Sequence, residues 1–193
     1  MRLVLFDIDG TLVNSLGAGK AALEQAMLTV YGETGPIASF DFHGRTDPAI
    51  VRGLLRSVDW TDEEIETGFE ATWDSYLAAL DRELAERDGQ VRPLPGVSDL
   101  LEVIEGDERF APGLVTGNMA GGAQRKLAAA GLDGRVGFGA YGWDSEWRED
   151  LPPLARERAQ RRFGRLFNME TAVVVGDTPE DSRCARANGA RAL

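Results

Sequence analysis

Two aspartates separated by a single residue, Asp7 and Asp9, directly follow the apolar run LVLF at residues 3–6. An Asp-x-Asp pair is by itself a weak signal, because such pairs are more often found in turns or on surfaces than in catalytic sites. Here Gly10 and Thr11 follow and add a tight turn and a hydroxyl group. The segment therefore offers two carboxylates and a hydroxyl at the end of a predicted strand.

A second acidic pair, Asp177 and Asp181, occurs in VVVGDTPEDS, just past another apolar run. If both runs are strands of one parallel sheet, the two pairs meet at its carboxyl edge, where such sheets bind ligands. Four clustered carboxylates repel one another unless a cation is present. Because no cysteine or histidine accompanies them, the oxygen-only ligand set favours a hard ion such as Mg²⁺.

The elements that must position these residues alternate along the chain. Continuous apolar runs lie at 3–6, 113–116 and 172–176, with a weaker run at 136–140. Runs without polar alternation suit strands that are covered on both faces. Because each run precedes a loop and a helical stretch, the sequence predicts an α/β fold with a Rossmann-like parallel sheet. Thr116 then falls at the same edge of the sheet as the two acidic pairs.

Residues 15–92 interrupt this alternation with helical patterns. ALEQAMLTVYG comes first, then DPAIVRGLL with Asp47 as the expected N-cap, then a long amphipathic helix whose Thr-Asp-Glu-Glu capping box starts at Thr61. RPLPG turns the chain back towards the helix VSDLLEVIEG. We therefore expect a helical cap domain of residues 15–92, inserted into a core domain of residues 1–14 and 93–193.

Three segments, FDIDGTL, LVTGN and GDTPEDS, resemble the first, second and fourth motifs of the haloacid dehalogenase superfamily, in the family's order. Together they span nearly the whole chain. The interval between Asp7 and Thr116 is similar to that of phosphoglycolate phosphatase and β-phosphoglucomutase relatives, in which a helical cap follows the first motif. This resemblance implies a Mg²⁺-dependent phosphohydrolase.

The resemblance also implies roles for the first two aspartates. Asp7 is the expected nucleophile, which attacks phosphorus in line and forms an aspartyl-phosphate. Asp9 is the expected acid–base group, which protonates the leaving oxygen and then activates water. Family members that break carbon–halogen or phosphonate bonds generally lack an acid at the second position. The presence of Asp9 therefore favours phosphate monoesters.

The remaining matched residues are expected to bind phosphate and metal. By the same resemblance, the Thr116 hydroxyl bonds a phosphoryl oxygen, and Gly117 and Asn118 offer backbone N–H groups. Asn118 has an alternative interpretation as a helix cap. The implied metal ligands are all oxygen atoms, from the carboxylates of Asp7 and Asp177, the carbonyl of Asp9 and, directly or through water, Asp181.

The third motif of the family normally supplies a lysine after the third core strand, and that lysine is missing here. Lys20 lies in the predicted cap. Lys126 lies on a helix that leads away from the strand end carrying Thr116, so we expect it to be poorly placed. Arg148, in the loop WDSEWREDLPPL, is the expected substitute, with a solvated surface arginine as the alternative. The residues expected to orient it are acidic neighbours: Asp144, Glu146, Glu149 and Asp150.

Substrate selectivity is expected to come from the cap segment GRTD at residues 44–47, with Lys20 and His43 nearby in sequence. Arg45 is a candidate for binding a substrate carboxylate or second phosphate bidentately, although a surface ion pair would also explain it. A further stripe has helical spacing and is more typical of cap core than of a ligand site: Trp73, Tyr76, Leu77 and Leu80.

Composition excludes several functional classes. The net charge of −11 opposes nucleic-acid binding, whose affinity comes chiefly from basic residues. The sequence shows no apolar run long enough to predict a membrane span and no signal-peptide pattern, so we expect a cytoplasmic protein. Cys184, the single cysteine, cannot form an internal disulfide and is expected to be a small buried helix residue.

The leading functional hypothesis is a phosphatase for a small phosphorylated metabolite, such as a phosphoglycolate-like compound or a sugar phosphate. A phosphomutase of the β-phosphoglucomutase type is the near alternative, because the same aspartyl-phosphate can pass to a substrate hydroxyl instead of water. A catalytically weak phosphate- or metal-binding regulator is an alternative from another class. The missing lysine favours it, and the four intact aspartates argue against it. The sequence leaves the substrate and the oligomeric state open.

Overall fold

The computed structural model describes all residues from 1 to 193. Its main sheet has five parallel strands in the order β5-β4-β1-β6-β7, as expected for an α/β fold. The weak run at 136–140 contributes only a two-residue strand, and GARAL supplies the edge strand beside β6. The strands are β1 (Arg2–Phe6), β4 (Phe110–Val115), β5 (Gly139–Ala140), β6 (Val173–Val175) and β7 (Arg191–Ala192).

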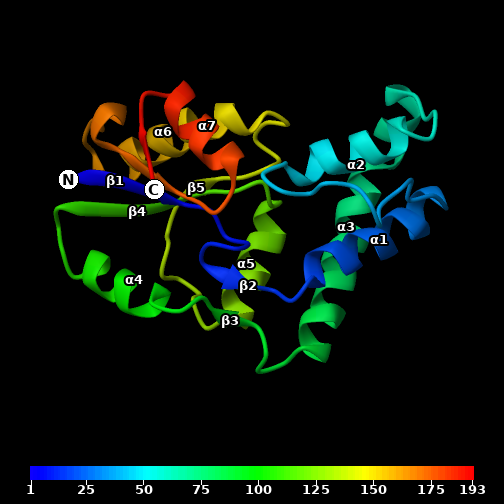
Figure 1. Ribbon diagram of the computed structural model, residues 1–193, viewed down its shortest axis with the longest axis horizontal. Coiled ribbons are helices and arrows are strands. Elements are labelled where there is room, and N and C mark those ends of the chain that lie inside the picture. The colour runs from blue at the N-terminus through cyan, green and yellow to red at the C-terminus, as the bar shows by residue number, and fades with distance from the viewer.

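Helices cover both faces of this sheet (Figure 1), which explains the uninterrupted apolar runs. Successive side chains of β1 point to opposite faces. Leu3 and Leu5 belong to a cluster with α6 and α7, whereas Val4 and Phe6 belong to a cluster with α4 and α5. The covering helices are α4 (Val97–Glu105), α5 (Ala120–Ala129), α6 (Leu151–Phe163) and α7 (Pro179–Ala187), with short 3₁₀ turns η1 (Arg148–Asp150) and η2 (Met169–Thr171).

Three further helices lie to one side of the sheet (Figure 1). The chain leaves the core through β2 (Val13–Asn14) and returns through β3 (Arg92–Pro93), and these two strands pair antiparallel. The helical segment is thus inserted into the core between two paired strands. No helix of the protein is both long enough and apolar enough to cross a membrane. The cap helices are α1 (Ala18–Tyr31), α2 (Asp47–Arg56) and α3 (Asp62–Glu86).

The starts of the cap helices test the predicted capping residues. Thr61 caps α3 through a capping box with Glu64, as expected. For α2 the expected N-cap, Asp47, is wrong. Thr46 takes that position and its Oγ1 accepts a hydrogen bond from the Ala49 N–H at 3.3 Å. Asp47 is the first helical residue, and its carboxylate instead reaches across to the core.

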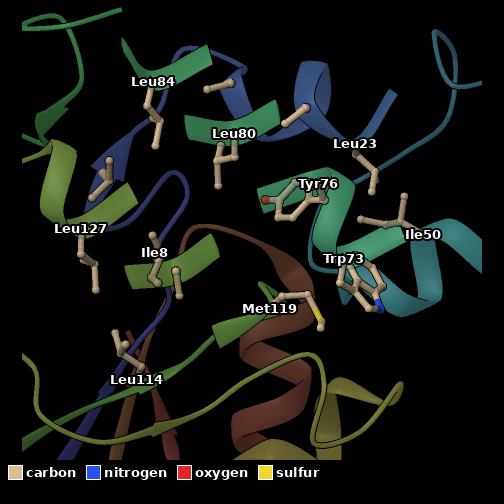
Figure 2. Close-up of a cluster of buried hydrophobic side chains, with 14 of the residues drawn as sticks. Ile8, Leu23, Ile50, Trp73, Tyr76, Leu80, Leu84, Leu114, Met119 and Leu127 are labelled. Atoms are coloured by element: carbon tan, nitrogen blue, oxygen red, sulfur yellow. The ribbon is translucent and has the colours of Figure 1, made fainter. Parts of the chain in front are cut away.

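One hydrophobic cluster extends from the core sheet into the cap (Figure 2). Ile8 and Leu127 of the core share it with Tyr76 and Leu80 of α3, and all of these side chains are buried. The stripe predicted on α3 is therefore largely cap core. The apolar contact between cap and core also fixes the cap directly above the carboxyl ends of the strands.

Candidate active site

The residues singled out by sequence converge at the carboxyl edge of the sheet. Asp7 follows β1, Thr116 follows β4 and Asp177 comes just after β6, and these three strands are neighbours. The Asp7 N–H donates to the Val175 carbonyl at 2.9 Å, which continues the strand pairing up to the candidate nucleophile. Asp7 and Thr116 are both buried. The sheet thus holds their backbones rigidly.

Arg148 lies between two carboxylates of this site. Its Nη2 atom is 3.0 Å from Asp7 Oδ2 and also donates to Asp181 Oδ1. All three side chains are less than 10% exposed, at 8%, 8% and 3% for Arg148, Asp7 and Asp181. Arg148 is therefore not a solvated surface arginine. It is a buried cation that offsets the repulsion between the two aspartates.

The loop carrying Arg148 does not orient it in the expected way. Asp144 accepts two hydrogen bonds from Arg158, at 2.6 Å each, and Glu146 pairs with Arg52 at 3.1 Å. The side chains that bind Arg148 come instead from the strand ends and α7, because its guanidinium turns inward from the loop. The two other expected partners are exposed: Glu149 and Asp150.

Lys126 contacts the other candidate catalytic carboxylate, so the expectation that it is poorly placed is wrong. Its Nζ donates to Asp9 Oδ2 and to Asn118 Oδ1, both at 2.6 Å, and its side chain is 5% exposed. Helical side chains lean towards the N-terminus of their helix, so Lys126 reaches back to the strand end. Gly19 of α1 leaves space for it, since a Cβ there would lie 2.9 Å from Nζ.

A feature of the sequence could have revealed this lysine. Lys126 lies one turn after Gly122 and Ala123 on α5, and both of those residues are buried. Residues three and four positions apart share a helix face. A lysine on the same face as two small buried residues points into the protein, where it needs an acidic partner.

Asn118 acts through its side chain and does not cap a helix. The residue at the N-cap of α5 is Met119. The Asn118 Nδ2 group donates to Asp9 Oδ2 and to Thr116 Oγ1, each at 2.8 Å. Ser15 donates to the other oxygen of Asp9 at 3.0 Å. Both oxygens of Asp9 are therefore held in place.

The two aspartates of FDIDG have pKa values shifted in opposite directions. Burial raises the pKa of Asp7 above its usual value, against the opposing charge of Arg148. Burial would also raise the pKa of Asp9, but Lys126 and the hydrogen bonds around it outweigh burial and lower that pKa. Asp9 is therefore held in its ionised form.

Three carboxylates can share a cation at this edge. Oxygen atoms of Asp7, Asp177 and Asp181 all lie within 4.8 Å of one another. Asp181 also completes the capping box of α7, because its Oδ2 accepts hydrogen bonds from the N–H and hydroxyl of the N-cap residue Thr178, at 3.1 and 2.6 Å. The Asp9 carboxylate is not part of this group, as it faces Lys126. An oxygen-only set of this kind fits a hard divalent ion.

A cavity of about 570 Å³ separates these residues from the cap. On its cap side Arg45 lies over the Phe40 ring at 5.4 Å, and Lys20 over the Phe42 ring at 5.0 Å. Arg45 thus stacks on an aromatic ring, and none of the ion pairs of the structure includes it. His43 is exposed, with Nδ1 2.8 Å from an Asp41 oxygen.

Asp47, which the sequence suggested both as a helix cap and as part of the selectivity segment GRTD, lines the cavity. Its Oδ2 accepts a hydrogen bond from the Met119 N–H at 2.8 Å, and its own N–H donates to the Gly117 carbonyl at 2.8 Å. Burial raises the pKa of Asp47 to about 6, in spite of the nearby Lys126. These two hydrogen bonds connect the start of the cap helix α2 to the core segment that follows Thr116.

Solved structures with the same fold support this arrangement of core and cap. A hydrolase from Pseudomonas syringae is 23% identical with a TM-score of 0.73, and the match covers 100% of this chain and 83% of that one. A predicted phosphoglycolate phosphatase from Haemophilus somnus is 20% identical with a TM-score of 0.62, and the match covers 100% of this chain and 84% of that one. The protein CbbY from Rhodobacter sphaeroides, in complex with phosphate, is 20% identical with a TM-score of 0.65, and this match covers 100% of this chain and 84% of that one.

Sequence comparison assigns the family. No curated protein matches the chain significantly. The family model of the haloacid dehalogenase-like hydrolases matches residues 1–189, which include the three motifs and the residues gathered around Asp7. The chain therefore belongs to the haloacid dehalogenase-like hydrolase family.

Proposed function

We propose that the protein is a Mg²⁺-dependent phosphatase that hydrolyses a small phosphate monoester through an aspartyl-phosphate on Asp7. The observation that carries this proposal is the position of Asp7. It lies at the end of the central strand, beside a buried arginine and within a group of three carboxylates, at the floor of a cavity. A carboxylate becomes a competent nucleophile towards phosphate when nearby cations offset the negative charge of both groups.

In the first step, an oxygen of Asp7 attacks phosphorus and the bond to the leaving oxygen breaks. Arg148 stays beside Asp7 and compensates the charge of the phosphoryl oxygens. Thr116 and the backbone at Gly117 lie at the neighbouring strand end and supply hydrogen bonds to the phosphoryl group. Mg²⁺ held by the carboxylates of Asp7 and Asp177 and the Asp9 carbonyl, with Asp181 ligating directly or through water, would neutralise phosphoryl charge.

Asp9 is the proposed acid–base group. The ionised Asp9 takes up a proton when the negatively charged substrate binds beside it. It then gives this proton to the leaving oxygen, and the resulting carboxylate takes a proton from the water that attacks the aspartyl-phosphate. Ser15, Asn118 and Lys126 hold its two oxygens in position. One side chain thus serves both steps, and the products are an alcohol and inorganic phosphate.

The substrate is proposed to be a small phosphorylated metabolite. The cavity volume of about 570 Å³ is within the range of small-molecule sites. Arg45 and Lys20 line its cap side, opposite Asp7, and are candidates for binding an anionic group of the substrate. The fold it shares with CbbY, which was solved in complex with phosphate, agrees with an anionic ligand.

The test is a panel of phosphorylated metabolites assayed for phosphate release with Mg²⁺, with EDTA, and with EDTA followed by excess Mg²⁺. We expect Mg²⁺-dependent release from at least one compound and loss of that activity in Asp7→Asn. If a sugar phosphate is converted into its isomer when a bisphosphate activator is added, instead of releasing phosphate, the protein is a mutase. No release from any compound, or unchanged release by Asp7→Asn, would contradict the proposal.

A further inference from the structure

The loop that carries Arg148 crosses from the core to the cap before it reaches the active site. We call residues 141–147 the bridging loop. Its base is fixed to the core, because the carboxylate of Asp144 pairs with Arg158 of α6 at 2.6 Å. The preceding residue, Trp143, stacks on Phe69 of α3, with ring centroids 6.3 Å apart and an interplanar angle of 28°. The loop therefore contacts both domains.

Glu146 makes the tightest of the contacts between this loop and the cap. Its carboxylate accepts a hydrogen bond from Arg52 Nη1 at 3.1 Å and lies 3.8 Å from Arg56 Nη1. Its carbonyl accepts a hydrogen bond from the Thr46 hydroxyl at 2.9 Å. Thr46 is buried at the start of α2. The backbone of Glu146 thus binds the N-cap of α2, and its side chain binds the C-terminal half of the same cap helix.

The Glu146–Arg52 pair is better protected from solvent than a typical surface ion pair. The side chains of Glu146 and Arg52 are 25% and 19% exposed. Arg52 also lies 4.2 Å from the centroid of the Phe69 ring, which limits its freedom. Such a pair has less screening by water and loses less side-chain entropy on forming than an exposed one.

Arg148 follows Glu146 by only two residues. Its carbonyl accepts a hydrogen bond from the Cys184 thiol at 3.2 Å, and the carbonyl of Glu149 accepts one from Asn188 Nδ2 at 2.7 Å. The backbone around Arg148 is therefore held by α7 on one side and by the cap on the other. Only Trp147 separates Glu146 from Arg148, so the hold of the cap on Glu146 restrains the backbone from which Arg148 extends.

We propose that Glu146 is a positioning residue that sets Arg148 against Asp7 only while the cap is seated on the core. The cap then controls access to the cavity and also the positive charge beside the nucleophile. This inference rests on the proposed function, since it assigns Arg148 the role of the cation in phosphoryl transfer. A displacement of about 1 Å in a catalytic group can cost up to about 10² in rate, so loosening this hold has a measurable effect.

The experiment compares Glu146→Gln with Glu149→Gln. Both changes remove one negative charge from the same segment, but Glu149 is exposed and its side chain forms no ion pair in the structure. With p-nitrophenyl phosphate and Mg²⁺ we expect Glu146→Gln to lower kcat about tenfold. Glu149→Gln should stay within about twofold of the parent protein.

A double-mutant cycle shows whether Glu146 acts through Arg148. In an Arg148→Ala background, Glu146→Gln should reduce kcat by less than about twofold, because the group it positions is gone. Arg52→Gln should reproduce the loss of Glu146→Gln, and the two together should be no worse than either alone. Glu66→Gln, which removes the exposed partner of Arg52, is the matched control on the cap side. If the losses in kcat from the single changes multiply in either double variant, the inference is overturned.

Two measurements do not require turnover. Hydrogen exchange of the Trp147 amide, which donates to Ser145 at 3.0 Å, should be faster in Glu146→Gln than in Glu149→Gln. Binding of inorganic phosphate, followed by calorimetry, should weaken in the same variant. Equal exchange and equal phosphate affinity in the two variants would refute the role of Glu146. Absence of catalysis in the parent protein would refute the proposed function alone.

Discussion

The two aspartates of FDIDG each have a cation of their own, and the two cations are held differently. Arg148 approaches Asp7 from a loop, is shared with Asp181, and depends on contacts from α7 and the cap. Lys126 approaches Asp9 from the last turn of α5 and is shared with the neutral Asn118. The charge beside the nucleophile can therefore change with loop position, whereas the charge beside the acid–base group is fixed by a helix.

This difference matches the demands of a two-step reaction. The nucleophile Asp7 meets a phosphate dianion, so its surroundings must supply positive charge when the substrate is bound. Asp9 must keep one orientation through both steps, and a helix-borne lysine with a neutral amide restrains it without attracting the phosphoryl group. We therefore expect substitutions around Asp7 to affect all substrates and substitutions around Asp9 to depend on the leaving group.

The largest effect is expected for the aspartates themselves. Asp7→Asn should abolish phosphate release from every substrate, because an amide keeps the shape of the side chain and loses its nucleophilicity. Asp9→Asn should lower the rate by at least about 10², and more for alkyl phosphates than for p-nitrophenyl phosphate, whose leaving group needs no proton. Steady-state kinetics across a leaving-group series measures both. Equal losses for Asp9→Asn across the series would remove its role as an acid.

The next largest effect is expected for Arg148. Arg148→Ala should reduce kcat and phosphate binding by about 10² or more, because charge on Asp7 and the substrate is left uncompensated. Arg148→Lys should recover part of the loss, since lysine restores the positive charge but cannot bind two oxygens side by side as a guanidinium group does. The loss should be similar for good and poor leaving groups. A fully active Arg148→Ala protein would favour the interpretation as a weak phosphate-binding regulator.

Substitution of Lys126 should have a smaller effect with a different signature. Lys126→Met removes the cation that restrains Asp9, so we expect a loss of about tenfold for alkyl phosphates and less for p-nitrophenyl phosphate. Arg125→Met is the matched control, because Arg125 is adjacent on α5 and pairs with Asp81 at the surface. If Lys126→Met lowers activity equally for all leaving groups, the proposed difference between the roles of Lys126 and Arg148 is wrong.

Sequence alone located the residues that depend on strand ends. Asp7, Thr116 and Asp177 each follow a continuous apolar run, and parallel strands bring their carboxyl ends together. Arg148 was identified through the family resemblance, as the substitute for the lysine that the third motif normally supplies after the third core strand. These positions follow from the local sequence pattern and from the parallel strand arrangement that the pattern predicts.

The residues that sequence missed depend on contacts between the domains. Lys126 needs the gap left by Gly19 of the cap. Glu146 was expected from sequence as a direct partner of Arg148, and its carboxylate pairs instead with Arg52 of the cap. Asp47 was taken for a helix cap because aspartate is common there, but Thr46 competes for that position and Asp47 bonds the core instead. Local pattern carries no information about which helix face an inserted domain turns towards the sheet.

The smallest predicted effect concerns this interdomain carboxylate and appears in stability. Asp47 faces Lys126 of α5 and the negative charges of Asp7 and Asp9 after β1, and burial raises its pKa to about 6, above an unfolded value near 3.9. Between these two pH values the folded state binds more protons than the unfolded state. The contribution of Asp47 to stability therefore falls as pH rises from about 4 to about 6, and the penalty persists above that range.

Asp47→Asn should remove this penalty, because an amide does not ionise and its oxygen can still accept from the Met119 N–H. We expect the variant to match the parent protein near pH 4 and to be more stable by about 1–2 kcal/mol at pH 7.5, which corresponds to a few degrees in Tm. Thermal unfolding of both proteins across this pH range, at constant ionic strength, measures the difference. A difference in Tm that does not change with pH would show that Asp47 is ionised throughout. The contact between cap and core would then include a charged carboxylate at all these pH values, stabilised by the nearby positive charge of Lys126.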